Sequence, residues 1–273
     1  MKRYIFLICS ILKYFFIYWF CQILCVVAVQ KFIRILYGKA ISTYEIINIT
    51  NKNSIYINSL ACVITLFIYI MLFRQKEKSL FKNFNFNSVN LKNHLLIMLL
   101  SIGLAAIVCS CLLLLHNRLK NYGQISNALI YNMQSLLGLI CYIILMPIFE
   151  EIFFREIIFN ELRNNLNIII SILIQAIIFG LSHGNLIQGI YSFIFAILAA
   201  HVYLWTNSLY SSIFFHIIFN LMASLIIPIF LCYTEKYVSI YIIAGCLLII
   251  SSLAILYKNT HNKLEIFNKI LNW

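Results

Sequence analysis

The chain has 273 residues, of which 63% are hydrophobic and 10% charged, with a mean hydropathy of +0.95. A soluble domain of this length needs far more polar surface, so the composition excludes a soluble globular protein. The net charge of +12 would suit nucleic acid, but the basic residues lie between long apolar segments, as in membrane proteins. We therefore predict a lipid bilayer, and no nucleic acid, as a partner.

Eight apolar segments approach or exceed the length of about 20 helical residues that crosses a hydrocarbon layer of about 30 Å. Lipid leaves no partner for unpaired backbone groups, so each segment is predicted to be helical. The predicted fold class is all-α, a polytopic transmembrane helix bundle of about eight spans, forming one integral membrane domain over residues 1–273. The segments are residues 4–29, 55–73, 95–115, 136–159, 168–181, 187–205, 209–232 and 239–257.

The first segment has no small-residue cleavage site after a short apolar core, so we expect a retained anchor and not a removed signal peptide. Cytoplasmic loops carry an excess of Lys and Arg, and cytoplasmic termini place twelve such residues inside against seven outside. We predict a multi-pass protein of the cell membrane with both termini in the cytoplasm. The inside set is Lys2, Arg3, Arg74, Lys76, Lys78, Lys82, Lys92, Arg155, Arg163, Lys258, Lys263 and Lys269; the outside set is Lys31, Arg34, Lys39, Lys52, Arg118, Lys120 and Lys236.

Two adjacent acids lie in the fourth segment, although the chain holds only 8 acidic residues, all of them Glu. Placing such a pair in hydrocarbon costs several kcal/mol unless it is neutralised, so Glu150 and Glu151 mark a candidate functional site. Arg155 shares a helix face with Glu151 at i,i+4 and can pair with it. Pro147 would loosen the helix one turn earlier. The alternative interpretation is a charged helix end that lies in water.

Later segments add three polar residues. His183 lies near the end of the fifth segment, and His216 and Asn220 are one turn apart in the seventh. Such side chains must face a bundle interior, although a single histidine there is more often a hydrogen-bonded core residue. At about 1.5 Å per residue from the connecting loops, Glu150 and His183 lie at one depth to within a turn, whereas His216 is about half as deep.

Taken together, Glu150-Glu151-x-x-x-Arg155, Phe179-x-x-x-His183 and His216-x-x-x-Asn220 resemble the CPBP family of intramembrane proteases. That family includes type II CAAX prenyl endopeptidases and bacterial proteins of bacteriocin maturation or self-immunity. The resemblance covers roughly residues 145–225, within a core protease region of about 136–225. One position departs from it, because the family often has Gly after the Arg and this chain has Glu156, which could alter helix contact or the local field.

The resemblance implies an endopeptidase whose substrate is a peptide or a prenylated peptide precursor. In a low-dielectric site Glu150 suits a general base toward a water that His183 also holds, and Arg155 neutralises Glu151. His216 and Asn220 can donate hydrogen bonds to the oxyanion. In the competing scheme, Glu150, His183 and His216 are ligands of a zinc ion. We favour the metal-free scheme and leave Zn²⁺ open.

Other classes are tested by their motifs. Aspartyl intramembrane proteases need two Asp, and site-2 zinc proteases need H-E-x-x-H; this chain has neither. The run Gly180-Leu181-Ser182-His183 approaches the G-x-S-G of rhomboid-like serine proteases but lacks the last Gly. Two non-enzyme alternatives stay open: a catalytically silent peptide-binding or immunity protein of the same fold, and a transporter with a polar relay.

Overall fold

The computed structural model describes residues 2–74, 86–115 and 134–271. These residues form helices and no β-strand; Phe86 and Ser208 pair in an isolated antiparallel bridge. The predicted all-α polytopic bundle is confirmed. By their contacts the residues divide into a first unit, within 1–84 and 121–150, and a second unit, within 85–120 and 151–273. The single integral membrane domain stays a prediction.

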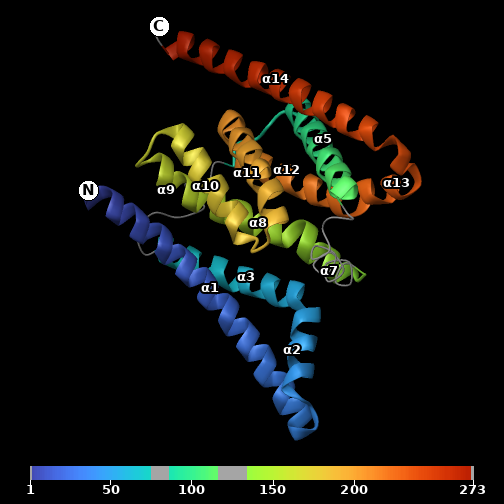
Figure 1. The fold of residues 1–273 in the computed structure, drawn as a ribbon. Coiled ribbons are helices and arrows are strands. Elements are labelled where there is room, and N and C mark those ends of the chain that lie inside the picture. The colour runs from blue at the N-terminus through green and yellow to red at the C-terminus, as the bar shows by residue number, and fades with distance from the viewer. Residues whose placement is uncertain (1, 75–85, 116–133, 272–273) are drawn as a thin grey trace. The chain divides into compact units, whose positions relative to one another are not determined.

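The first unit is built on a long first helix, α1, which packs along α3 and also contacts α2 (Figure 1). Buried small side chains let α1 and α3 approach, with Cys25 of α1 against Ile57 and Ala61 of α3. The π-helical segment η3 also contacts α3. The elements are α1 (Lys2–Tyr37), η1 (Gly38–Ala40), α2 (Thr43–Lys52), α3 (Ser54–Arg74), α7 (Leu136–Ile140), η3 (Cys141–Leu145) and α8 (Met146–Glu151).

Helix α2 lies between the first two predicted spans, where no helix was predicted. It begins with a capping box, in which the Ser42 hydroxyl accepts from the Glu45 amide and the Glu45 carboxylate accepts from the Ser42 amide at 2.8 Å. Arg34 of α1 donates to the Ile41 carbonyl at 2.9 Å and to the Thr43 hydroxyl at 3.1 Å. These bonds fix the reversal of the chain from α1 into α2.

The fourth predicted span is helical from Leu136 to Arg163 but changes its winding along the way. Two π-helical segments, η3 and η4 (Ile152–Phe159), flank α8, and α9 (Asn160–Arg163) ends the span. Pro147 has no N–H to donate back along the helix, and η3 lies directly before it. A π-helix spans five residues per hydrogen bond, so it is wider and rises less per residue than an α-helix.

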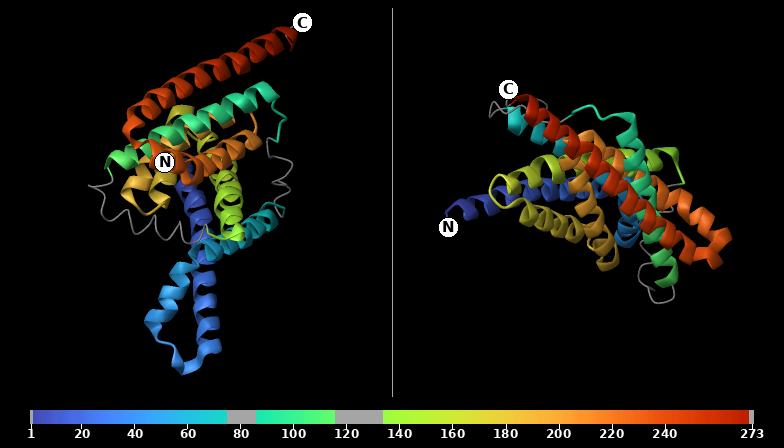
Figure 2. Two further views of the ribbon diagram at one scale, coloured as in Figure 1. Left: turned by 90° about the vertical axis from the view of Figure 1, so that its right-hand side faces the viewer. Right: turned by 90° about the horizontal axis from the view of Figure 1, so that it is seen from above.

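In the second unit, α14 runs along α5 (Figure 2), and α10 packs against α11. Both contacts depend on glycine. A Cβ atom added to Gly103 would lie 2.9 Å from the Gly245 carbonyl oxygen, and one added to Gly180 would lie 2.7 Å from the Gly189 carbonyl oxygen. Only glycine lets the helices approach so closely at these points. The remaining elements are α5 (Leu91–Leu115), α10 (Ile168–Ser182), α11 (Leu186–Thr206), α12 (Leu209–Leu221), η5 (Met222–Ile226), α13 (Ile227–Thr234), η6 (Glu235–Tyr237) and α14 (Val238–Leu271).

Each of the eight predicted spans is helical. Six helical stretches of the described residues are long and apolar enough to cross a membrane, and Ile168–Ser182 is a shorter apolar helix. The last stretch, Leu209–His261, is interrupted by the 3₁₀ turn η6 and so contains the seventh and eighth predicted spans. Apolar helices of this number indicate an integral membrane protein. Its orientation stays a prediction, because the length and composition of a helix do not distinguish the two sides of a membrane.

Candidate functional site

Glu151 and Arg155 form a fully buried ion pair one turn apart at the start of η4. Arg155 Nε lies 3.0 Å from Glu151 Oε2, and Nη2 donates to Oε1 at 3.3 Å. The side chains of both residues have no exposed surface. The i,i+4 spacing predicts this pair, and its burial identifies it as an interior pair and not a water-exposed helix end.

Gln175 is a further hydrogen-bond partner of Arg155, and it is not among the six site residues predicted from the sequence. Its side-chain oxygen accepts from Arg155 Nη1 at 2.6 Å, and its amide nitrogen donates to the Ala196 carbonyl at 3.0 Å and the Ile172 carbonyl at 3.1 Å. Gln175 therefore joins η4, α10 and α11 around one guanidinium. The signal for it was present, because a Gln in the middle of an apolar span needs a polar partner.

His216, on α12, reaches the same carboxylate. Its Nδ1 is 2.9 Å from Glu151 Oε1, and the imidazole is buried against the Phe195 ring, with centroids 4.4 Å apart. A carboxylate accepts hydrogen bonds, so Nδ1 of His216 carries a proton and the bond to Glu151 leaves Nε2 for another partner. The expected difference in depth between His216 and the glutamates does not prevent contact. One reason is that η4 rises less per residue than the α-helix on which that depth was counted.

His183 is the C-cap residue of α10, where the helix ends before Gly184 adopts φ +65°. Its Nδ1 lies 2.8 Å from the Phe179 carbonyl, so this ring also carries its proton on Nδ1 and its lone pair on Nε2. The Phe179 ring contacts both imidazoles, with centroids 5.0 Å from His183 and 6.1 Å from His216. It also lies 5.3 Å from the guanidinium carbon of Arg155. Phe179 thus connects His183 to the ion pair.

The structure brings three of the six predicted residues, Glu151, Arg155 and His216, into direct contact. Asn220 lies one helical turn after His216 on α12 and is half-buried. Glu150 is half-buried in α8, and within the first unit it interacts electrostatically with Tyr18 of α1 and Cys62 of α3.

Glu156, the departure from the family pattern, is buried and has its own partners. Tyr203 of α11 donates its hydroxyl to Glu156 Oε1 at 3.0 Å, and Asn160 donates its side-chain amide to Oε2 at 2.9 Å. The sequence suggested that Glu156 could alter the contact between helices, and in the structure its hydrogen bond with Tyr203 joins η4 to α11. Arg163 lies close by, 5.8 Å above the Tyr203 ring.

A zinc site is not formed by the described side chains. Within residues 2–74, 86–115 and 134–271, no group of three or more His, Cys or Glu side chains is arranged to hold a metal ion. His183 and His216 bond through Nδ1 to a carbonyl and a carboxylate, and such bonds leave Nε2 as the ring nitrogen that could bind a metal ion. The metal-free scheme stays the favoured prediction, and the chemistry proposed below uses protein side chains alone.

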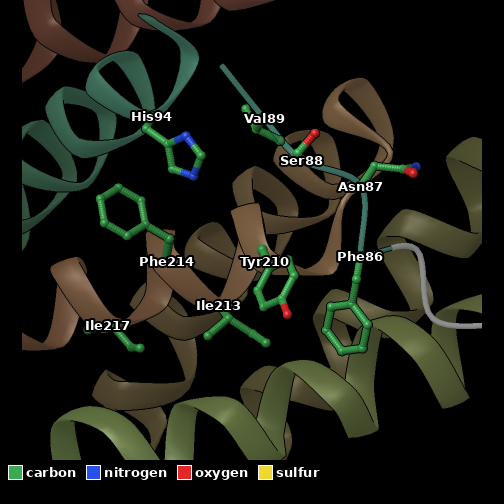
Figure 3. A pocket seen from close by; sticks show the side chains of 9 residues that line it. All are labelled: Phe86, Asn87, Ser88, Val89, His94, Tyr210, Ile213, Phe214 and Ile217. Carbon is green, nitrogen blue, oxygen red and sulfur yellow. The ribbon is translucent and has the colours of Figure 1, made fainter. Parts of the chain in front are cut away.

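A pocket of about 470 Å³ lies elsewhere in the second unit, beside the N-terminal end of α12 (Figure 3). The rings of Phe86 and Tyr210 are tilted by 42° with centroids 4.5 Å apart, and the His94 and Phe214 ring centroids are 5.4 Å apart. The lining residues are Phe86, Asn87, Ser88, Val89, His94, Tyr210, Ile213, Phe214 and Ile217. None of the six predicted site residues lines this pocket.

Comparison with known proteins agrees with the motifs. Residues 132–222 match the family model described as type II CAAX prenyl endopeptidase Rce1-like, and this range contains all six predicted site residues. No curated protein and no solved structure matches the chain. Over residues 132–222 the chain is thus similar to the type II CAAX prenyl endopeptidase Rce1-like family, and the resemblance to the CPBP intramembrane proteases is confirmed.

Proposed function

We propose that this chain is an intramembrane endopeptidase that hydrolyses a peptide bond of a membrane-associated or small peptide substrate with a glutamate-activated water. The observation that carries the proposal is the buried network of Glu151, Arg155 and His216 inside the region that matches the endopeptidase family. A buried charge of this kind is costly to maintain, and its presence in an apolar helix supports a functional role.

The two glutamates have different roles in this proposal. Glu151 is fully buried and bonded to both Arg155 and His216, so its carboxylate serves to orient the histidine. Glu150, the preceding residue of the same helix, is half-buried and so more accessible to a water than Glu151. Glu150 is therefore the general base, and Glu151 and Arg155 are positioning residues.

The reaction begins when Glu150 takes a proton from a water that His183 holds through Nε2. The water oxygen then bonds to the carbonyl carbon of the substrate. His216 in its protonated form donates from Nε2, and Asn220 donates from its amide, to the oxygen that becomes negative. When the C–N bond breaks, Glu150 returns the proton to the leaving amine. The Nδ1 bonds of both histidines support this scheme, because they direct Nε2 away from the protein partners.

The test is a set of single variants in proteoliposomes with a cleavable peptide. We expect Glu150→Gln, His183→Ala and His216→Ala each to lower kcat by at least about 100-fold, the usual contribution of a general base or an oxyanion donor. His201→Ala is the matched control, since its Nδ1 bonds to the Ile197 carbonyl at 2.8 Å as His183 bonds to Phe179. Full activity of Glu150→Gln would contradict the base assignment.

A chelator separates the metal-free scheme from the zinc scheme. We expect wild-type protein to keep its activity after exhaustive treatment with a strong chelator, whereas loss of activity that returns with added Zn²⁺ would replace this mechanism by a metal-assisted one. A protein that binds the peptide tightly but never cleaves it would instead be the silent peptide-binding alternative.

A further inference from the structure

The proposed base has polar neighbours in a part of the chain that lies outside the family match. The match begins at residue 132, whereas α1 and α3 belong to the first 74 residues. Within the first unit, the Tyr18 ring of α1 packs against Phe149, the residue directly before Glu150, with ring centroids 5.2 Å apart. The aromatic contact brings the phenol of Tyr18 to the helical turn that carries the proposed base.

The hydroxyl of Tyr18 is held from its own helix. Gln22, one turn later on α1, donates its side-chain amide to the Tyr18 oxygen at 2.9 Å. A phenol has one O–H to donate, and because Gln22 occupies the oxygen as an acceptor, that O–H is directed to another partner. The Cys62 thiol of α3, which is buried, interacts electrostatically with the hydroxyl.

The carboxylate of Glu150 completes this cluster, because it interacts electrostatically with both the Tyr18 hydroxyl and the Cys62 thiol. Tyr18 and Gln22 are half-buried in a helix whose exposed residues are mostly apolar. Polar side chains at such depth in a membrane helix are expensive, and they usually line a polar cavity or a functional site.

We propose that Tyr18 is a positioning residue for Glu150, so that α1 contributes to the active site although it lies outside the family region. Gln22 and Cys62 orient the phenol, and the phenol fixes the side-chain conformation and polar surroundings of the carboxylate. This inference rests on the proposed function, in which Glu150 is the base.

The first experiment compares Tyr18→Phe with Tyr69→Phe. Tyr69 is a matched control, because its hydroxyl also joins α1 to α3, by a 2.7 Å bond to the Tyr14 carbonyl. We expect Tyr18→Phe to lower kcat about tenfold to a hundredfold, the usual loss for a bond that supports a charged group, with little change in KM. Tyr69→Phe should lower the melting temperature and leave kcat unchanged. Equal kcat values for the two variants would overturn the inference.

A second experiment does not depend on activity. Melting temperatures in detergent are measured for Tyr18→Phe, Glu150→Gln and the double variant. Coupling between the two residues makes the effect of Tyr18→Phe smaller in the Glu150→Gln protein than in wild type, whereas Tyr69→Phe should have the same effect in both. Additive effects of Tyr18→Phe and Glu150→Gln would refute the proposed link between Tyr18 and Glu150. If coupling is found but wild type cleaves no peptide, the proposed function fails and the link between Tyr18 and Glu150 remains.

Discussion

Side-chain partners distinguish the two neighbouring glutamates. Glu151 has its charge neutralised by Arg155 and accepts from His216, and no part of its side chain is exposed. Glu150 lies beside polar groups of α1 and α3 and is half-buried. Sequence alone could not separate their environments, because adjacent residues of a helix differ by about 100° in direction and either could face a cavity.

Removing the arginine should destabilise the fold. Arg155→Ala leaves Glu151 as an unpaired buried charge, and breaking a buried pair in this way costs about 3–5 kcal/mol. The expected result is a large fall in the melting temperature in detergent. Arg163→Ala, in which a half-buried arginine above the Tyr203 ring is lost, is the control and should cost much less. An unchanged melting temperature for Arg155→Ala would show that the pair is unimportant for stability.

Replacing the glutamine should weaken the same network more mildly. Gln175→Leu keeps the approximate volume but removes the acceptor of Arg155 Nη1 and leaves the Ala196 carbonyl without that donor. We expect a loss of about 1–3 kcal/mol in stability, measured by thermal unfolding. Gln188→Leu, at a half-buried position of α11, serves as the control. A stability loss no greater than that of the control would argue against the bridging role of Gln175.

The sequence predicted a site residue where a charged side chain in hydrocarbon has a clear free-energy cost. It was less informative where the role of a residue depends on a contact with a residue distant in the chain. The pairing of Glu151 with Arg155 follows from i,i+4 spacing and from the absence of other neutralising groups nearby in the chain. The contact between His216 and Glu151 depends on two helices meeting, and the depth count from loops placed them apart. One of the two partners of Glu156 is Tyr203, 47 residues later, and no local pattern indicates that pair.

At the scale of helices, two glycine contacts set how closely neighbours approach. Gly180→Ala places a carbon 2.7 Å from the Gly189 carbonyl between α10 and α11, and Gly245→Ala places one 2.7 Å from the Gly103 carbonyl between α14 and α5. Each should cost about 1–3 kcal/mol, the usual penalty for overpacking. Because α10 carries His183 at its end, Gly180→Ala should also reduce the cleavage rate. If Gly245→Ala and Gly180→Ala lower the melting temperature and the cleavage rate equally, the packing of α10 has no specific role in positioning His183.

The start of α2 should depend on pH through Glu45. Hydrogen bonds from the Ser42 backbone and side chain hold the pKa of this carboxyl below its usual value. A lowered folded pKa contributes stability above the unfolded pKa, and that stability is lost as pH falls through the folded value. Corrected amide exchange of α2 should be faster in Glu45→Gln than in wild type at neutral pH and equal in strong acid. A difference that persists in acid would contradict this cause.

Helices were predicted well where a long apolar run requires one, as in the eight spans. Short and irregular elements were not predicted. Helix α2 has too few residues to cross a membrane and becomes evident from its capping box and its packing, with Ile46 against Ile33 and Ile41. The π-helical segments depend on backbone bonding near Pro147 and around the ion pair, which apolar periodicity does not report.

For the whole molecule, the long apolar helices of the described residues indicate an integral membrane protein, and one region of it is similar to an endopeptidase family. The matched region, residues 132–222, contains the ion pair, both histidines and Asn220. Its polar cluster around Glu150 also includes α1 and α3, from the part of the chain that sequence comparison leaves unassigned. We therefore expect a fragment of residues 132–222 to lack the support that Tyr18 gives to the base.

Mass spectrometry of candidate peptides, incubated in H₂¹⁸O with membranes that contain wild-type protein or Glu150→Gln, tests the central claim most directly. The predicted result is a pair of fragments from one cleaved bond, with one ¹⁸O in the new carboxyl group, formed by wild type and not by Glu150→Gln. The same labelled fragments from both membranes would contradict a hydrolytic centre built on Glu150.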